Sequence, residues 1–438
     1  MNMNSFANDP NVALLSRARH LIEKGELQEA ALTLNEARAQ IPDDPRVFMM
    51  AGLMAEKAGN VLGAFQLMIR GTQIAPKWGP GFAELAQLHA RQKQGREARE
   101  SAKKAAALSP KDKNVLDSLA TTAKILCDYT MAAGYFRKIL ALHPEDAMVQ
   151  RQLAACLDKV GTKDEALDLL NKIISRHPDD EDSLLGRAQI LLQVGRLEEA
   201  AGDTARLLAL RPDNATYAFY DSLTHGQTPS RKPAALTQAI FDEYAQDFDY
   251  HLVNKLEYRL PQLVATEIAT LYPGKKLNLL DLGCGTGLLG AHLGRIDGQL
   301  TGVDVSPKMI EQAKRLKLYD GFHTVDLESA LRKVPNGFYH AATALDVFVY
   351  IGKLNDIITA CANLLPAGGH LIFSCETASE EGPDFVLPIN TYRYQHKRSH
   401  VEAMCQRAGF SLAVQEVGLR LEKGHKAPGF LVTATRLA

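Results

Sequence analysis

The chain has 438 residues, with 50 Lys and Arg against 51 Asp and Glu and a formal net charge of −1. At about 100–200 residues per domain this length predicts two to four domains. The balanced charge disfavours a nucleic-acid-binding protein, which normally carries a strongly basic face. The 6 cysteines show neither CxxC nor Cys–His spacing, so we expect no disulfide framework, no metal site and a reducing, cytoplasmic location. No apolar run of about 18 residues occurs, so we expect no membrane span.

Prolines recur every 34 residues in the first half of the chain, at positions 42, 76, 110, 144, 178 and 212. A fixed period of this length is typical of a repeat array. An alanine stands twelve residues before each proline, and an alanine or glycine stands 24 residues before it. Each repeat is therefore predicted to form two helices that cross at the small residues, with the proline after the second helix.

The turn between the two helices is predicted to contain a left-handed glycine in four copies. These glycines are Gly25, Gly59, Gly161 and Gly195. In the third and fourth copies Lys93 and Cys127 stand at this position instead, and Gly95 suggests a shifted turn. Residues 214–223 are predicted to form a further helix that caps the last repeat.

These repeats resemble the tetratricopeptide repeat over about residues 11–212, in six copies. The resemblance implies a groove, lined by the first helix of each repeat, that binds a protein or peptide partner. The positions expected to face this groove are Met49, Leu53, Asn114, Lys124, Met148, Arg151 and Gln189. They mix apolar, polar and oppositely charged side chains, so they predict no charged ligand. Packing or plain solvent exposure is the alternative for each of them.

A polar stretch, residues 224–235, predicts a linker to a second domain. Strand and helix patterns then alternate from LNLLDL (277–282) to HLIFSCE (370–376), which predicts a parallel sheet that binds ligands at the carboxyl ends of its strands. The last segment, 411–436, has two strand-like runs without a helix between them and predicts an antiparallel hairpin that turns around 423–429. We therefore expect an all-α array over 1–223 and an α/β domain over 236–438.

A glycine-rich loop, 283–287, follows the first strand and enters a helix. Its glycines satisfy the dinucleotide pattern GxGxxG from Gly285 onward, but that pattern begins one residue late and Asp281 would repel a pyrophosphate. S-adenosylmethionine fits the loop and its neighbouring residues better than a dinucleotide does, because it has no phosphate and its positive charge suits Asp281. Asp304, at the end of the second strand, would accept two hydrogen bonds from the ribose diol. A dehydrogenase is the weakest alternative.

At this point the sequence resembles the class I methyltransferases. The resemblance is carried by LLDLGCGTG (279–287), VDVS (303–306) and the closing hairpin, and it covers about residues 236–438. It implies a Rossmann-like sheet of seven strands with an antiparallel last strand. More narrowly, 241–261 and 345–354 resemble bacterial methyltransferases fused to tetratricopeptide repeats and the Williams–Beuren-region methyltransferases of animals.

Further cofactor contacts are predicted at the strand ends and on the segment before the first strand. Asp326 would accept from the adenine amino group, with the backbone N–H of Leu327 on a ring nitrogen, or would simply start a helix. The expected cofactor-binding residues are Asp281, Gly283, Gly285, Gly287, Asp304, Val305, Met309, Asp326, Leu327, Asp346, Arg259 and Tyr244. Val305 and Met309 would pack on adenine, Arg259 would pair with the cofactor carboxylate, and Tyr244 would either cover the sulfonium or pack in the core.

The acceptor is expected near the ends of the fourth and fifth strands and in the loop after the fifth. His396 is the expected general base, with a solvated surface histidine as its alternative, and Glu376 and Tyr350 are further catalytic candidates. Arg393 and Tyr394 are expected to bind the substrate, Arg393 through an acidic group of the acceptor. A surface arginine is the alternative for Arg393.

The sequence thus predicts a methyltransferase that uses S-adenosylmethionine and an oxygen or nitrogen acceptor, with the repeats recruiting a protein or peptide. Two alternatives remain open. One is a small-molecule methyltransferase that uses the repeats only for assembly, and the other is an adaptor that binds the cofactor without catalysis.

Overall fold

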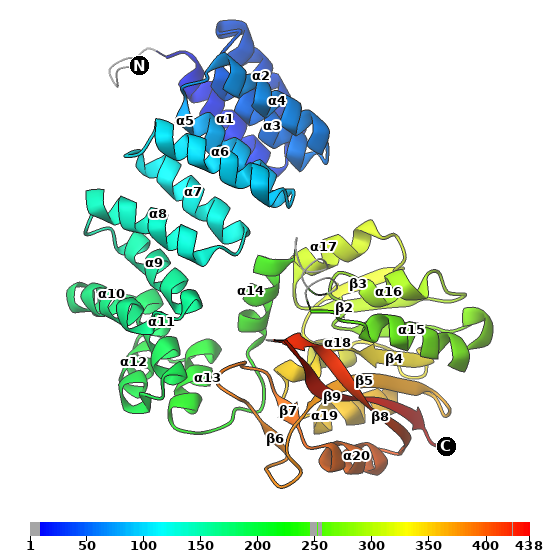
Figure 1. Ribbon diagram of the computed structural model, residues 1–438. Helices are drawn as coiled ribbons and strands as arrows, with labels where there is room; N and C mark the ends of the chain where they lie inside the picture. Colours follow the sequence, from blue (N-terminus) through cyan, green and yellow to red (C-terminus); the bar gives the residue numbers. More distant parts are fainter. Residues whose placement is uncertain (1–8, 246–251, 253–255, 423) are drawn as a thin grey trace. The chain divides into compact units, whose positions relative to one another are not determined.

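The computed structural model describes residues 9–245, 252, 256–422 and 424–438 (Figure 1). The chain up to Ile190 forms one compact unit and the chain from Leu191 forms a second. No helix in the described ranges is both long enough and apolar enough to cross a membrane.

The predicted repeat helices are present, and each is 13 or 14 residues long in the described part of the chain. They are α1 (Asn11–Lys24), α2 (Leu27–Gln40), α3 (Pro45–Lys57), α4 (Val61–Ile74), α5 (Gly79–Arg91), α6 (Gly95–Leu108), α7 (Lys113–Ile125), α8 (Tyr129–Leu142), α9 (Ala147–Val160), α10 (Lys163–Arg176), α11 (Glu181–Gln193) and α12 (Leu197–Leu210). The alanines twelve residues before the prolines, from Ala30 to Ala200, are all fully buried. At Gly52 a Cβ would lie 2.6 Å from Cγ of Met68, so close packing of the helices requires the small residues.

The turns inside the repeats correct one sequence expectation. The four turn glycines have φ between 79° and 94°, as expected for left-handed helix ends. Lys93 and Cys127 adopt the same left-handed conformation, with φ of 61° and 55°. The turn of the third repeat is therefore not shifted, and Gly95 is simply the first residue of α6.

Helix α13 (Ala215–Thr224) follows the repeats where a capping helix was predicted. The Asn214 side chain accepts hydrogen bonds from the backbone N–H groups of Thr216 and Tyr217, which fixes the start of the helix. α13 packs on α12, and the Thr204 hydroxyl donates to Asp221 at 2.8 Å. α13 also contacts the α/β domain within the second compact unit, because the rings of Tyr220 and Tyr392 meet edge to face, with centroids 6.0 Å apart.

The predicted Rossmann-like sheet with an antiparallel last strand is confirmed. Its main strands are β1 (Leu279–Leu282), β2 (Leu300–Asp304), β3 (Gly321–Thr324), β4 (Ala341–Ala344), β5 (His370–Thr377), β8 (Phe410–Glu422) and β9 (His425–Arg436). β3, β2, β1, β4 and β5 lie side by side and parallel, β9 pairs antiparallel with β5, and β8 pairs with β9.

The sheet also has two short strands that the sequence analysis did not predict. β6 (Phe385–Val386) and β7 (Gln395–His396) pair antiparallel with each other, and β7 pairs with the carboxyl end of β5. Two-residue strands are too short to show an alternating pattern, so the sequence reads as a loop there.

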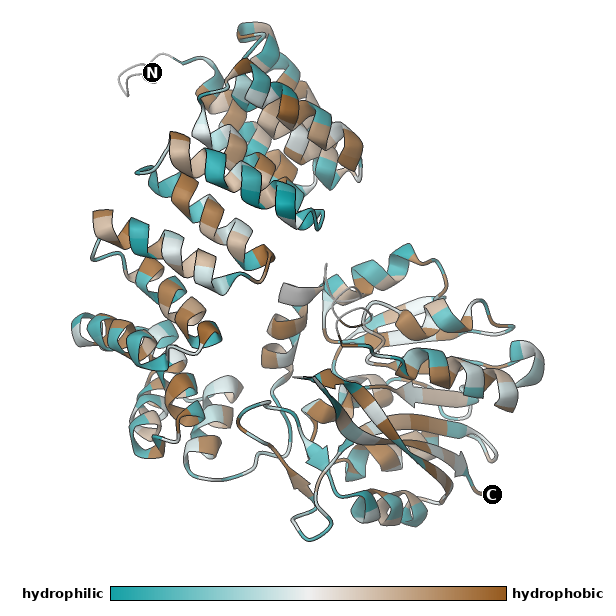
Figure 2. Cartoon of the chain, in the orientation of Figure 1, coloured by the Kyte–Doolittle hydropathy of each residue, from teal (hydrophilic) through white to brown (hydrophobic). Residues whose placement is uncertain are grey.

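Alternate side chains of each strand point to opposite faces of the sheet. On one face Leu279 and Leu300 pack with α15 (Leu260–Leu271) and α16 (Leu288–Leu293), and on the other face Leu280 and Val303 pack with α18, α19 and α20. The bounds of the remaining helices are α14 (Ala234–Tyr244), α17 (Pro307–Arg315), α18 (Leu327–Leu331), α19 (Asn355–Leu364), α20 (Arg398–Arg407) and the 3-10 turns η3 (Pro273–Lys275) and η4 (Phe348–Tyr350). Hydrophobic residues gather along the strands, whereas α6 is largely hydrophilic (Figure 2).

The predicted linker lies directly against the α/β domain. The carbonyl of Pro229 accepts a 2.8 Å hydrogen bond from the Tyr394 hydroxyl, and Arg231 forms a β-bridge with Ile351. Whether the domains divide at residue 223 stays a prediction, because the compact units divide at Ile190 and leave α12 and α13 with the α/β domain.

Candidate active site

The glycine-rich loop after β1 is a left-handed turn that brings the chain close to the end of β2. Gly283, Gly285 and Gly287 have φ of 70°, 53° and 87°, values that glycine adopts without strain. At Gly283 a Cβ would lie 2.3 Å from Val347, so the loop needs this glycine for space as well as for conformation. The N–H of Gly285 donates to the Asp304 carboxylate at 2.9 Å.

Asp281 lies on β1 beneath this loop, with only 3% of its surface exposed. Its carboxylate accepts hydrogen bonds from the hydroxyls of Tyr319, at 2.7 Å, and Thr343, at 2.8 Å. Burial raises the pKa of Asp281 to about 6. Sequence reasoning missed Tyr319 and Thr343, since neither belongs to a local motif and both reach Asp281 across the sheet.

Asp304 ends β2, where it also accepts from the N–H of Ser306 at 2.8 Å. Burial raises the pKa of Asp304 as well, with a smaller effect in the same direction from Asp242 on α14. Asp242 accepts a hydrogen bond from the Ser306 hydroxyl at 2.5 Å, so a third acid lies near the end of β2.

These acids test whether the site suits the predicted cofactor. Within the described ranges neither Asp281 nor Asp304 forms an ion pair, although both are nearly buried. Buried carboxylates without a cationic partner favour a positively charged ligand and disfavour a pyrophosphate. The residues therefore fit S-adenosylmethionine, for which the glycine loop would supply backbone contacts and Asp304 would accept from the ribose diol.

The residues predicted to contact adenine lie in different environments, and only some of them have an exposed surface. Asp326 caps α18, because its side chain accepts from the N–H and the hydroxyl of Ser329 at 2.9 and 2.7 Å. Burial acts to raise the pKa of Asp326, but these hydrogen bonds outweigh it and the pKa is lowered. Val305 and Leu327 are half-buried beside β2 and β3, whereas Met309 is fully buried inside α17 and presents no surface to a ligand.

Two predicted cofactor residues lie before the first strand. Tyr244 is the last residue of α14, and its side chain lies outside the described part of the structure. Arg259 precedes α15 with an exposed side chain, and it forms no ion pair with any residue that the structure describes. The described contacts do not link the Arg259 side chain to Asp281 or Asp304, so its predicted role stays a prediction.

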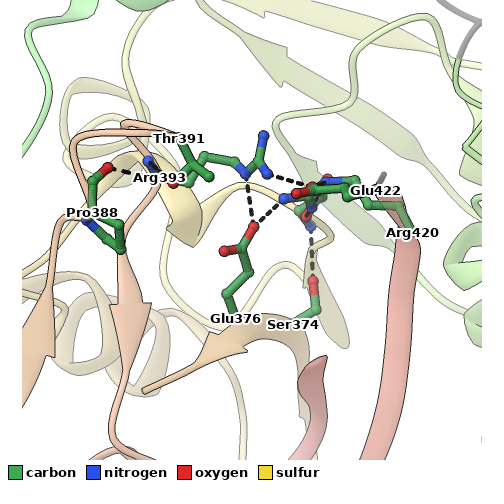
Figure 3. Close-up of polar contacts among 8 residues, drawn as sticks. Ser374, Glu376, Pro388, Thr391, Arg393, Arg420 and Glu422 are labelled. Atoms are coloured by element: carbon green, nitrogen blue, oxygen red, sulfur yellow. Dashed lines mark hydrogen bonds and ion pairs between the residues drawn. The ribbon is translucent and has the colours of Figure 1, made fainter. Parts of the chain in front are cut away.

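The ends of β4 and β5 carry a buried network of arginines and acids (Figure 3). Arg420, on β8, donates to both oxygens of Asp346 at 2.5 and 2.8 Å, to Glu376 and to Glu422. Arg393 donates from Nε to Glu376 at 2.8 Å and from Nη2 to Glu422. Asp346 and Glu376 are therefore partners of arginine in this network, and the predicted contact of Asp346 with the cofactor stays a prediction. Its backbone N–H donates to the Ser374 hydroxyl at 2.8 Å.

Sequence reasoning missed Arg420, the centre of this network. Only 4% of its side chain is exposed. One signal was available: it stands between Leu419 and Leu421 in a strand-like run, where a charged residue needs a buried partner.

The predicted base, His396, lies on β7 and is 2% exposed. Its Nε2 is 2.9 and 3.1 Å from the carbonyl oxygens of Ile351 and Gly352, so Nε2 carries the proton and donates. Burial lowers the pKa of His396 to about 4, which makes it a poor proton acceptor and favours a role in holding the loop after β4. The surface alternative is wrong as well, because the side chain is buried.

The two tyrosines predicted on the acceptor side, Tyr394 and Tyr350, differ in what they can do. Tyr394 is fully buried with its hydroxyl bound to Pro229, so it has no surface with which to bind a substrate. Tyr350 follows β4, and burial raises its pKa, so it stays protonated at neutral pH and can donate a hydrogen bond.

Protein-family models match both halves of the chain. A family model described as a methyltransferase domain matches residues 280–371, and one described as a tetratricopeptide repeat matches residues 13–76, 128–181 and 159–215. The chain is 27% identical over 194 residues to the ubiquinone biosynthesis O-methyltransferase of Bordetella avium, covering 41% of this chain and 78% of that protein. It is 30% identical over 154 residues to the protein of the same name from Xanthomonas campestris pv. campestris, covering 34% and 60%.

Among solved structures, magnesium protoporphyrin IX methyltransferase from Synechocystis PCC 6803 matches 46% of this chain and 99% of its own, with 20% identity and a TM-score of 0.36. YrrB, described as a TPR protein with an unusual peptide-binding site, matches 43% of this chain and 97% of its own, with 15% identity and a TM-score of 0.36. The sequence motifs, the sheet order and the two family models agree. The chain joins tetratricopeptide repeats to a methyltransferase domain of the class I fold, and the residues of that domain's site fit S-adenosylmethionine as the methyl donor.

Proposed function

We propose that the protein transfers the methyl group of S-adenosylmethionine to an oxygen of its acceptor, and that the repeats recruit a protein or peptide. The observation that supports the cofactor site is the buried pair of Asp281 and Asp304, which lacks a cationic partner in the described ranges. The names of the relatives favour oxygen over nitrogen as the acceptor atom.

The cofactor supplies an electrophilic methyl group on a sulfonium. The residues of this chain then have to hold the donor, orient the acceptor and exclude water. Asp304 and the N–H groups of the glycine loop would hold the donor. Tyr350 would donate a hydrogen bond to the acceptor, and the Arg393–Glu376–Arg420 network would keep the ends of β4 and β5 rigid.

Cofactor binding is tested by calorimetry on the full chain. We expect Asp304→Ala to weaken S-adenosylmethionine binding by at least tenfold, because it removes the diol acceptor and frees the N–H of Gly285 from its partner. Asp297→Ala, an exposed aspartate between β1 and β2, is the matched control and should bind normally. Equal affinity in the Asp304 variant would remove this residue from the cofactor site.

The acceptor is tested with cell extract and methyl-labelled cofactor. Label that enters protein supports recruitment of a protein acceptor, and label that enters small molecules supports the alternative in which the repeats serve assembly. Absence of label with intact cofactor binding would favour a non-catalytic adaptor. In each case Asp304→Ala is the background control.

Recruitment by the repeats is tested with a chain that lacks residues 1–190. If recruitment is correct, this chain should bind the cofactor normally but methylate the natural acceptor at least tenfold more slowly. Unchanged methylation by the shortened chain would refute recruitment and leave the methyltransferase activity standing.

A further inference from the structure

Lys232 is a buried lysine in the segment that precedes α14. Only 7% of its surface is exposed. Its Nζ lies 5.1 Å from the centroid of the Tyr350 ring, and this amine forms no side-chain hydrogen bond or ion pair with any residue that the structure describes. Burying a cation without an anionic partner is costly, so a lysine in this position needs a reason.

The backbone holds Lys232 at the end of β4. Its N–H donates to the Tyr350 carbonyl at 3.0 Å, and the carbonyl of Ser230 accepts from the N–H groups of Gly352 and Lys353 at 2.8 and 2.9 Å. These bonds tie the segment to the loop that carries Asp346 and Tyr350. Lys232 therefore lies at the carboxyl edge of the parallel strands, where α/β sheets bind their ligands.

The charged side chain that acts on Lys232 is another cation. Burial, with a smaller contribution from Arg393, lowers the pKa of Lys232 to about 8, so the amine is still mostly protonated at neutral pH. Arg393 uses Nε and Nη2 for Glu376 and Glu422, and its Nη1 donates to no residue in the described ranges. Nζ of Lys232 therefore has no anionic partner among the described residues, and its donors remain available to a ligand.

We propose that Lys232 binds a carboxylate of the methyl acceptor, so that the substrates of this enzyme are carboxylate-bearing molecules. The proposal rests on the methyltransferase function above and names its substrate class. The aromatic rings of Tyr350 and Phe241, whose centroids are 5.4 Å apart, provide an apolar surface beside the carboxylate site. Tyr350 lies beside the anion site, in the η4 turn that follows β4.

The test is a titration of the full chain, saturated with S-adenosylhomocysteine, with matched charged and neutral probes. Benzoate and benzamide represent an aromatic small molecule, and N-acetylglutamate amide and N-acetylglutamine amide represent an acidic peptide side chain. The variants are Lys232→Gln, Lys232→Arg and the control Lys353→Gln, an exposed lysine in the adjacent loop. Binding is followed by ligand-observed NMR, with calorimetry of the cofactor on every variant.

We expect one of the two carboxylates to bind the wild-type chain at least tenfold more tightly than its amide. Lys232→Gln should lose this preference, while Lys232→Arg and Lys353→Gln keep it. The carboxylate that shows the preference identifies the source of the acceptor, small molecule or peptide. No preference in the wild-type chain, or an equal preference in Lys232→Gln, would overturn the proposal. Loss of cofactor binding by the wild-type chain would instead overturn the methyltransferase function.

Discussion

At the residue scale, the site contains ionisable groups whose burial opposes their charged forms. Asp281 and Asp304 lack cationic partners in the described ranges, and Lys232 lacks an anionic one. As long as no ligand is bound, the burial of these groups destabilises the folded chain. Their charges are complementary to those of the proposed methyl donor and acceptor. Asp281 and Asp304 match the positive donor, and Lys232 matches the carboxylate of the acceptor.

The pKa of Asp281 predicts how cofactor binding depends on pH. Folding without ligand raises this pKa from 3.8 to about 6, so the unliganded chain gains stability as the pH falls through 6 and the carboxylate becomes neutral. A cationic ligand needs the ionised form, so its affinity should be about tenfold lower at pH 5 than at pH 7. Calorimetry at the two pH values measures this. The Asp281→Asn variant should bind S-adenosylmethionine more weakly at pH 7, and its affinity should not fall between pH 7 and pH 5. If the affinity of this variant fell as much as that of the wild type, Asp281 would not be the group that the cationic ligand requires to be ionised.

Lys232 makes a separate prediction about stability. A pKa lowered from 10.5 to about 8 corresponds to a folding penalty of about 3 kcal/mol at neutral pH. Lys232→Met should therefore raise the free energy of unfolding of the unliganded chain at pH 7, by up to that amount. The unfolded chain holds this proton up to a higher pH than the folded chain, so wild type regains stability between pH 8 and 10.5 and the difference should vanish there. Chemical denaturation of both proteins at pH 7 and pH 10 checks the sign, with Lys353→Met as the neutral control.

At the element scale, the repeat helices were predictable because each depends on a local pattern that recurs six times. The sheet followed from alternating strands and helices, and the hairpin from two strand patterns without a helix between them. The two-residue strands β6 and β7 were not predictable, since so short a pairing depends on the partner strand. That pairing buries His396, which explains why a residue that looks like an exposed loop base holds the backbone instead.

The turns of the third and fourth repeats can be tested directly. Cys127 takes a left-handed conformation that a side chain disfavours by about 1–2 kcal/mol, and glycine avoids this strain at some cost in unfolded-state entropy. Cys127→Gly should therefore raise the free energy of unfolding by about 0.5–1 kcal/mol. Gly161→Ala, at the equivalent turn of the fifth repeat, should lower it. Denaturation curves that show Cys127→Gly to be destabilising would contradict the strain argument.

The candidate site shows where sequence reasoning stops. The glycine loop, Asp281 and Asp304 were predictable because the motif sits in one stretch between a strand and a helix. Arg420 reaches Glu376 across 44 positions of sequence, and Lys232 reaches Tyr350 from a segment that reads as a linker. Such contacts depend on the sheet order and on the path of the chain, so they cannot be predicted from the spacing of residues within one segment.

At the scale of the whole molecule, the compact units do not coincide with the change in sequence pattern. α12, the last repeat helix, and α13, the helix that caps the repeats, group with the α/β domain, and Tyr220 of α13 contacts Tyr392. A chain of residues 191–438 should therefore unfold at a higher temperature than one of residues 224–438, because only the longer chain retains this contact. Calorimetric unfolding of the two chains measures the difference. Equal midpoints would show that α13 adds nothing to the stability of the α/β domain.

The placement of Lys232 also affects how this protein can be rearranged. The segment that leaves α13 supplies a side chain to the acceptor side of the sheet before the α/β domain begins. A recombinant that grafts another targeting array onto this methyltransferase at residue 235 would keep the cofactor motifs and lose that lysine. The connector is part of the specificity apparatus, so a functional exchange of modules has to take place upstream of Pro229.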